Sequence, residues 1–157
     1  MQESAKKTTW FESALLVALF LACAVALSPN LADADLWGHV QYGRDALIEG
    51  ISTTTTYSFT AGDYRWINHE NLSELILALV ATLAGGTGLM VMKCLFGLIV
   101  IGLIVHAARR GGSGALATCL VALLVSVNIA YYWSVRPQIF SFVLFALLMS
   151  LVMWCFH

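Results

Sequence analysis

The way charge is distributed along this chain constrains its fold more than any other feature of the sequence. Seven of the nine Asp and Glu residues lie between residues 30 and 74. Most of the remaining sequence is apolar, and the 157-residue chain as a whole is 60% hydrophobic and 11% charged. A typical soluble domain is about 45–50% apolar and about 25% charged. We therefore expect an integral membrane protein with one polar loop. The net charge of −1 provides no basic surface for nucleic acid, so we expect no nucleic-acid partner.

Four apolar segments have the length of a transmembrane helix, which needs about 20 mostly apolar residues. They are residues 10–28, 87–108, 115–131 and 139–156. Lys6 and Lys7 precede the first segment, and Arg109 and Arg110 follow the second. Because basic residues favour the cytoplasmic side, these positions predict four spans with both ends inside and the loop 30–74 outside. We expect the first segment to be an uncleaved span, because further apolar spans follow it.

Two short helices are predicted in this outer loop. The segment 36–49 has apolar residues at helical spacing, with Asp33 placed to cap its start and Gly50 placed to end it. Leu36, Val40, Gly43 and Leu47 share one stripe of this helix. We expect its apolar side chains, Leu36, Val40 and Leu47, to face the membrane helices.

The second loop helix is predicted over residues 71–84, before the glycines at residues 85–88. The loop is expected outside and Arg109 inside, so the chain crosses the membrane once between them. Residues 87–108 make that crossing, and we therefore expect the helix 71–84 to lie along the outer membrane surface. The predicted fold is therefore an all-α membrane protein with about four transmembrane and two interfacial helices, forming a single domain over residues 1–157. The apolar pattern continues to the last residue, and we expect the chain to be the N-terminal part of a longer protein.

The polar chemistry of the loop begins with Asp33 and Asp35, two carboxylates within one helical turn. This spacing suits a divalent cation such as Mg²⁺ or Mn²⁺, because hard cations prefer oxygen ligands. One of the two acids can instead serve as a general base toward a hydroxyl group. A helix start with acids stabilised by the helix dipole explains the same spacing without any site.

Four further residues are candidates for substrate binding. His39 lies one turn after Asp35 and can ligate a metal, orient a carboxylate or bind phosphate. It also fits a plain polar position on an interfacial helix. His69 and Glu70 precede the second helix, where they can reach the same site only if the loop folds back on itself. Arg136 lies at the same membrane face, where a guanidinium can clamp a phosphate or bind lipid headgroups.

The topology and the motifs together resemble a known family. The topology is an inside N-terminus, one span and an acidic outer loop. The motifs are Asp33-Ala-Asp-Leu-Trp-Gly-His39 and Trp66-Ile-Asn-His-Glu70 in that loop and Arg136-Pro-Gln138 in a later outer turn. This arrangement resembles the GT-C superfamily of membrane glycosyltransferases, which includes protein O-mannosyltransferases and aminoarabinose transferases. The resemblance implies an integral, multi-pass protein of the bacterial inner membrane that contacts lipid and the remainder of its own longer chain.

The same resemblance implies a reaction and roles for the loop residues. It implies a polyprenyl-phosphate-sugar donor, an acceptor at the outer face, and a catalytic acid that by position is Asp33 or Asp35. The remaining candidates would hold the substrates or a metal, with Arg136 on the donor phosphate. The alternative is a non-enzymatic membrane assembly or binding protein with an acidic outer loop. In either case, unpaired charge near hydrocarbon is costly. We therefore expect Asp33 and Asp35 to share one polar pocket with at least one of His39, His69 and Glu70.

Overall fold

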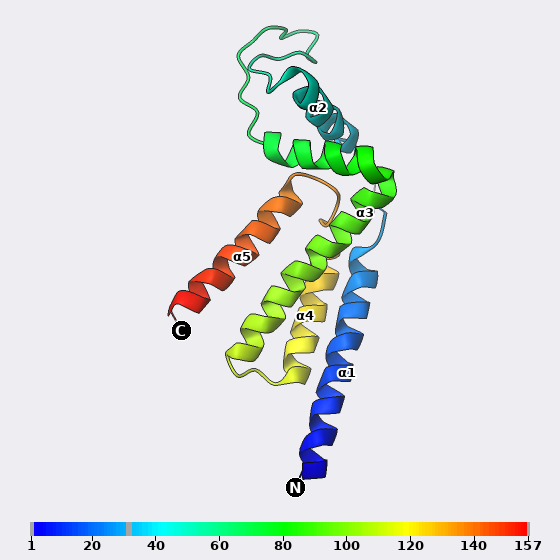
Figure 1. The fold of residues 1–157 in the computed structure, drawn as a ribbon, viewed down its shortest axis with the longest axis vertical. Coiled ribbons are helices and arrows are strands. Elements are labelled where there is room, and N and C mark those ends of the chain that lie inside the picture. The colour runs from blue at the N-terminus through cyan, green and yellow to red at the C-terminus, as the bar shows by residue number, and fades with distance from the viewer. Residues whose placement is uncertain (1, 31–32, 157) are drawn as a thin grey trace. The chain divides into compact units, whose positions relative to one another are not determined.

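Helices are the only regular elements in the part of the chain that the computed structural model describes, residues 2–30 and 33–156, with side chains described from Trp10 onward (Figure 1). The five helices are α1 (Gln2–Leu27), α2 (Leu36–Glu49), α3 (Asn71–Arg110), α4 (Ala115–Ala130) and α5 (Gln138–Phe156). Within these residues the extended pairing is limited to a single isolated bridge between Thr54 and Arg65. The prediction of an all-α fold is confirmed.

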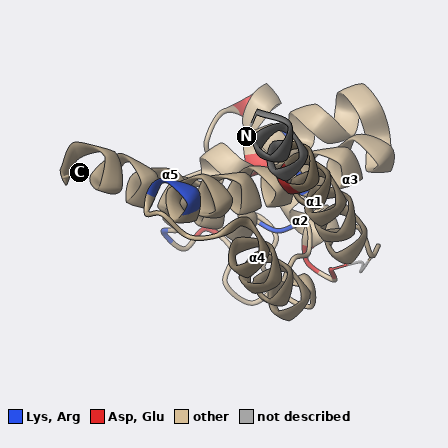
Figure 2. Ribbon diagram, turned by 90° about the horizontal axis from the view of Figure 1, so that it is seen from below, with Lys and Arg blue, Asp and Glu red and all other residues tan. Residues whose placement is uncertain are grey.

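Three of these helices are long and apolar enough to cross a membrane. They are the Trp10–Leu27 part of α1, the 40-residue α3 and the 19-residue α5. The predicted span 115–131 corresponds to α4, which has 16 residues and is shorter than the usual length of about 20. The count of four spans therefore stays a prediction. Neither α4 nor α5 contains Lys, Arg, Asp or Glu, and Figure 2 shows how few positions of the ribbon are charged.

The helix α3 consists of two helical segments, which meet at Gly85. This glycine has φ 60° and ψ −155°, a conformation that interrupts the helix and that side-chain-bearing residues rarely adopt. The helix is therefore kinked at Gly85, between residues 71–84 and the turn 86–91, as Figure 1 shows. The boundary lies where the sequence predicts it. The placement of the first segment along a membrane surface stays a prediction.

The chain divides into two compact units, and the first is an apolar helix bundle. It contains α1, the part of α3 from Met92 onward, α4 and α5. Its buried core joins Leu27 of α1, Ile101 of α3 and Ala122 of α4 to Trp133. The indole Nε1 of Trp133 donates a hydrogen bond of 3.0 Å to the carbonyl oxygen of Lys93, which satisfies its polar atom in the core.

Two polar contacts tie α3 to α1 and to the residues just after it within this first unit. Lys93 is buried, and its Nζ donates a 2.6 Å hydrogen bond to the carbonyl oxygen of Pro29, just after α1. Arg109 Nη2 lies 2.7 Å from Glu12 Oε2, which ties the end of α3 to α1. These contacts join parts of the first unit to each other. The candidate site residues all lie in the second unit.

The second unit contains α2, the loop after it, α3 up to Val91, and the short segment Val135–Pro137. The helix α2 has the bounds that the sequence predicts, and Gly50 ends it with φ 87°. The predicted cap Asp33 is wrong by two residues, because the N-cap residue is Asp35. Asp33 accepts a hydrogen bond of 3.0 Å from the backbone N–H of Asp35. The loop between the helices is irregular, as expected for its run of threonines.

The prediction for the apolar stripe of α2 is only partly right. Val40 is buried and Leu36 is half-buried, but Leu47 is 57% exposed. The buried residues of α2 are Val40 and Gly43, which both lie on the predicted stripe. This difference has a physical reason: the contact with α3 is made through the smallest residue of α2, so the helices touch along a shorter stripe than the apolar pattern indicates.

Candidate functional site

Close packing at Gly43 places α2 against the first turns of α3. A Cβ atom added at Gly43 would overlap the backbone of Glu74 and would lie 2.8 Å from the Cβ of Ala78. Real Cβ atoms do not approach other atoms this closely, so only glycine fits here. Side chains one turn away from Gly43 on α2 can therefore reach the side chains at the start of α3.

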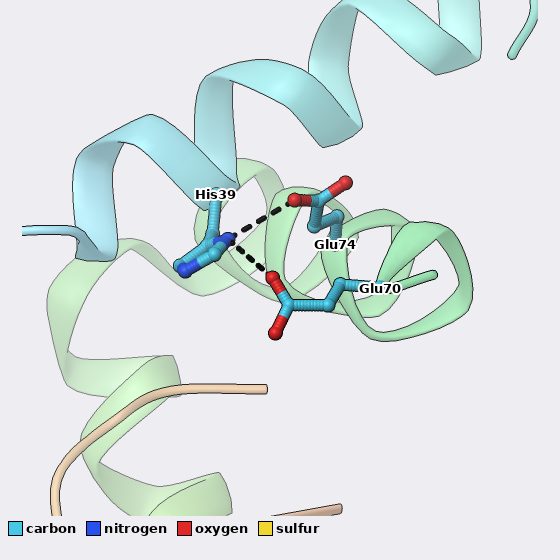
Figure 3. Close-up of side chains that lie close together, drawn as sticks. All are labelled: His39, Glu70 and Glu74. Atoms are coloured by element: carbon cyan, nitrogen blue, oxygen red, sulfur yellow. Dashed lines mark hydrogen bonds and ion pairs between the residues drawn. The ribbon is translucent and has the colours of Figure 1, made fainter. Parts of the chain in front are cut away.

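His39 is the α2 residue one turn before Gly43, and it meets two glutamates. Its Nδ1 lies 3.0 Å from Glu74 Oε1 and 3.6 Å from Glu70 Oε2 (Figure 3). One ligand atom from each of the three residues lies within 4.8 Å of the others. We call His39, Glu70 and Glu74 the histidine cluster. The helix α2 thus directs His39 toward the first turns of α3.

Glu74 is the buried member of the histidine cluster, with 2% of its surface exposed. The side-chain amide of Asn68 donates a hydrogen bond to Glu74 Oε2, while Oε1 faces His39. Asn68 also accepts a hydrogen bond of 2.9 Å from the backbone N–H of Glu70 through Oδ1. Asn68 therefore orients both glutamates, since it fixes the backbone that carries one and the carboxylate of the other.

Asp33 and Asp35 form a second cluster with Arg136, a residue about one hundred positions later in the chain. The guanidinium Nε of Arg136 forms an ion pair with Asp33 Oδ2, and its Nη2 donates a 2.6 Å hydrogen bond to Asp35 Oδ2. We call these three residues the arginine cluster. The Asp33 side chain is 11% exposed and that of Asp35 is 63% exposed. A single arginine thus neutralises part of the charge of both carboxylates.

The two carboxylates further stabilise the charged form of Arg136. The hydrogen bond to Asp33 is the largest cause that raises the pKa of the Arg136 guanidinium above its ordinary value, and Asp35 acts in the same direction. Arginine is already protonated at any physiological pH. Arg136 therefore remains a permanent cation in this cluster.

His69 lies apart from the other predicted site residues. Its side chain is 87% exposed, and its Nε2 is 4.0 Å from Glu70 Oε1, at the limit of an ion pair. Of the six predicted residues, the structure brings Asp33, Asp35 and Arg136 into one cluster and His39 and Glu70 into the other. Both clusters lie in the second unit, and the backbone hydrogen bond from His39 N–H to the Asp35 carbonyl oxygen places them one helical turn apart along α2. A single pocket that Asp33 and Asp35 share with at least one of His39, His69 and Glu70 stays a prediction.

Of the two clusters, the histidine cluster has the donor set that fits a divalent cation better. It offers an imidazole nitrogen and two carboxylates, ligands that suit Mn²⁺ or Zn²⁺. Two carboxylates against one imidazole also leave excess negative charge at a mostly buried position. In the arginine cluster, by contrast, a guanidinium already occupies the carboxylate oxygens that the sequence assigned to a metal.

Two residues of this arrangement were not predicted from the sequence as site residues: Glu74 and Asn68. Glu74 lies four positions after Glu70, a spacing that places both on one face of a helix. The same spacing separates His39 from Gly43, so a face with a histidine and a close-packing glycine meets a face with two acids. This matched spacing is the sequence signal that identifies Glu74.

Comparisons with known proteins do not add to this picture. No family model, no curated protein and no solved structure matched the chain.

Proposed function

We propose that this chain is the front part of a multi-pass membrane glycosyltransferase of the GT-C type. It would transfer a sugar from a polyprenyl-phosphate donor to an acceptor hydroxyl at the outer face of a bacterial inner membrane. The observation that carries the proposal is the arginine cluster: a permanent cation and two candidate bases meet in a chain that has little charge elsewhere.

The arginine cluster suggests how binding and catalysis are linked. A donor phosphate competes with the carboxylates for Arg136, because a guanidinium binds either group in the same forked geometry. When the phosphate takes over that contact, Asp33 or Asp35 loses its partner and becomes a stronger base. The freed carboxylate then accepts the proton of the acceptor hydroxyl.

The bond changes in this proposal balance. The acceptor oxygen forms a bond to the anomeric carbon of the sugar while the bond from that carbon to the phosphate oxygen breaks. The electron pair of the broken bond stays on the leaving polyprenyl phosphate, whose added charge Arg136 stabilises. The proton of the acceptor hydroxyl ends on Asp33 or Asp35. Of the two carboxylates, Asp33 is better shielded from solvent, because its side chain is less exposed.

We assign any divalent cation of this enzyme to the histidine cluster instead of to Asp33 and Asp35. His39, Glu70 and Glu74 would hold it, and Asn68 would orient two of these ligands. When bound, such a cation supplies positive charge that attracts the anionic donor to this part of the chain.

The membrane topology belongs to the same proposal. Three apolar helices of sufficient length and the shorter α4 support a multi-pass protein, with the loop 30–74 outside and the turn before α4 inside. Thiol labelling of intact cells tests this with Ser58→Cys in the loop and Ser113→Cys in the turn. An impermeant reagent should label the first variant only. Labelling of Ser113→Cys from outside would overturn the topology.

A second candidate function is supported by the same arginine contacts. If Arg136 stays bound to both acids, the cluster is a structural clamp between the start of α2 and the segment before α5. The chain would then be a non-enzymatic membrane assembly or binding protein, and its loop acids would have no catalytic part.

Sugar transfer by the full-length protein separates these two functions. The assay uses a panel of polyprenyl-phosphate sugars and compares the native protein with Asp33→Asn and Asp35→Asn. The glycosyltransferase proposal expects transfer from at least one donor and loss of transfer in at least one Asn variant, with unchanged membrane expression. If no donor is used, or if both variants retain full activity, the acids belong to a structural clamp.

A further inference from the structure

We propose that a cavity beside α2, outside both clusters, binds a neutral sugar. The cavity has a volume of about 350 Å³ and lies within the second unit, between the C-terminal half of α2 and the loop that follows it. Its walls include the three aromatic rings of Tyr42, Tyr57 and Trp66. Its volume is at the lower end of the range of ligand sites, about 300–1,000 Å³, which suits one or two sugar rings.

The aromatic residues form one contiguous cluster at the cavity, which we call the aromatic wall. Tyr42 contacts Tyr57 edge to face, with ring centroids 4.8 Å apart, and contacts Trp66 at 5.3 Å. The C–H groups on one face of a pyranose pack well on such a surface, because aromatic rings carry negative charge on their faces. The wall therefore supplies the apolar half of a sugar site.

Two acids supply the polar half of the site. Asp45 and Glu49 line the cavity, and their spacing of four residues places them on one face of α2. The side-chain amide of Gln41 donates a 2.8 Å hydrogen bond to Asp45 Oδ1, which orients that carboxylate. Carboxylates accept hydrogen bonds from sugar hydroxyl groups, and charged acceptors make the stronger bonds of this kind.

The lining also selects against other classes of ligand. None of the described residues that line the cavity is Lys or Arg, so a phosphate would meet two carboxylates without compensation. A quaternary ammonium ligand needs aromatic faces on several sides of one point. Here the rings of Tyr42 and Tyr57 are in edge-to-face contact, so one ring covers a face that such a ligand would need. A neutral polyol fits both observations.

One residue, Asn68, joins the cavity to the histidine cluster. Asn68 lines the cavity and also donates to Glu74 of the histidine cluster. We infer that the site holds a sugar of the acceptor, and this assignment rests on the proposed glycosyltransferase function. Binding of a free sugar does not depend on that function, so the two can fail separately.

Saturation-transfer NMR on the full chain in detergent tests the site directly. The probes are methyl glycosides of neutral hexoses, glucose 6-phosphate and choline. We expect binding of at least one neutral glycoside and no competing binding by the other two. Tyr57→Ala should weaken that binding roughly threefold to tenfold, the usual range for loss of one aromatic contact. Tyr57 is an exposed residue, so the variant should fold.

Two further variants keep the outcome decisive. Phe59→Ala is the matched control, because Phe59 is fully exposed in the same loop and does not line the cavity. Glu49→Gln removes one acid without touching the aromatic wall. The proposal is overturned if no neutral glycoside binds, if choline binds in its place, or if binding is the same in Tyr57→Ala, Glu49→Gln and Phe59→Ala. Sugar binding without any transfer activity would count against the glycosyltransferase and not against the site.

Discussion

The two acid pairs of the second unit have the same formal charge and different partners. Asp33 and Asp35 are held by an arginine, whereas Glu70 and Glu74 are held by a histidine and an amide. An arginine never loses its proton, but a histidine changes its charge near neutral pH. The first pair is therefore always partly neutralised, whereas the described partners of the second pair include no permanent cation.

This difference assigns separate tasks to the two clusters. A carboxylate held by a guanidinium is ionised and becomes reactive only when another anion displaces it. A buried carboxylate beside an imidazole is suited to bind a cation that balances the charge. The comparison therefore predicts that the two clusters respond differently to mutation, to added cations and to each other.

The largest effect should come from Gly43→Ala. This substitution moves His39 on α2 away from Glu70 and Glu74 without changing any charge. The new methyl group would overlap the backbone of Glu74, so α2 must move away from α3. We expect the free energy of unfolding to fall by about 3 kcal/mol, the upper range for overpacking. Thermal unfolding in detergent measures this change.

Gly38→Ala is the control for that experiment. It lies on the same helix with no atom within 4 Å of the added Cβ. Replacing a helical glycine by alanine normally stabilises by about 1 kcal/mol. Equal effects of the two substitutions would contradict the close contact at Gly43.

The next effect concerns the response to a cation. Mn²⁺ at well above its dissociation constant should raise the unfolding free energy of the native protein by about 2 kcal/mol, through binding to the folded state. Glu74→Gln should abolish this increase, because it removes one ligand charge and keeps the side-chain shape. Without a cation, the variant should be as stable as the native protein or more so. An undiminished Mn²⁺ effect in Glu74→Gln would place the cation elsewhere.

Arg136→Ala should destabilise the protein by about 1–2 kcal/mol, between the values for exposed and buried ion pairs. The loss of the ion pair should cost most at Asp33, because this carboxylate is nearly buried and cannot be fully solvated by water. Arg136→Lys should restore only part of the loss, because one ammonium cannot form the forked contact. In a double-mutant cycle, Asp33→Asn should reduce the effect of Arg136→Ala. Strictly additive effects would show that the two residues do not interact.

The smallest effect should come from His69→Ala. This imidazole is 87% exposed and lies outside both clusters. We expect a change in unfolding free energy within about 0.5 kcal/mol, as for other exposed positions, and an unchanged response to Mn²⁺. A loss of the Mn²⁺ response would add His69 to the cation ligands.

Much of the helical framework could be predicted from the sequence, because local signals mark its boundaries. Apolar periodicity and Gly50 define α2, and the glycines at residues 85–88 predict the break in α3 at Gly85. These signals lie within a few residues of the feature that they predict. The helix α4 is shorter than a usual transmembrane span, because the chain turns at Tyr131.

The pairing of site residues was harder to predict, because it depends on contacts between distant segments. The motifs identified Asp33, Asp35 and Arg136, but not that the arginine binds both acids. Glu74 lies in a helix that looks apolar, and its burial follows from a glycine 31 positions earlier, Gly43, that brings α2 close. Sequence spacing shows which residues share a face, whereas the packing of the two helices decides which faces meet.

The most direct test of the different roles of the two acid pairs is Mn²⁺ binding followed by electron paramagnetic resonance. The full chain in detergent is titrated alongside His39→Ala, Asp35→Asn and His69→Ala. The account predicts bound Mn²⁺ in the native protein, in Asp35→Asn and in His69→Ala, with binding lost in His39→Ala. Binding that is lost in Asp35→Asn and kept in His39→Ala, or no binding to the native protein, would contradict it.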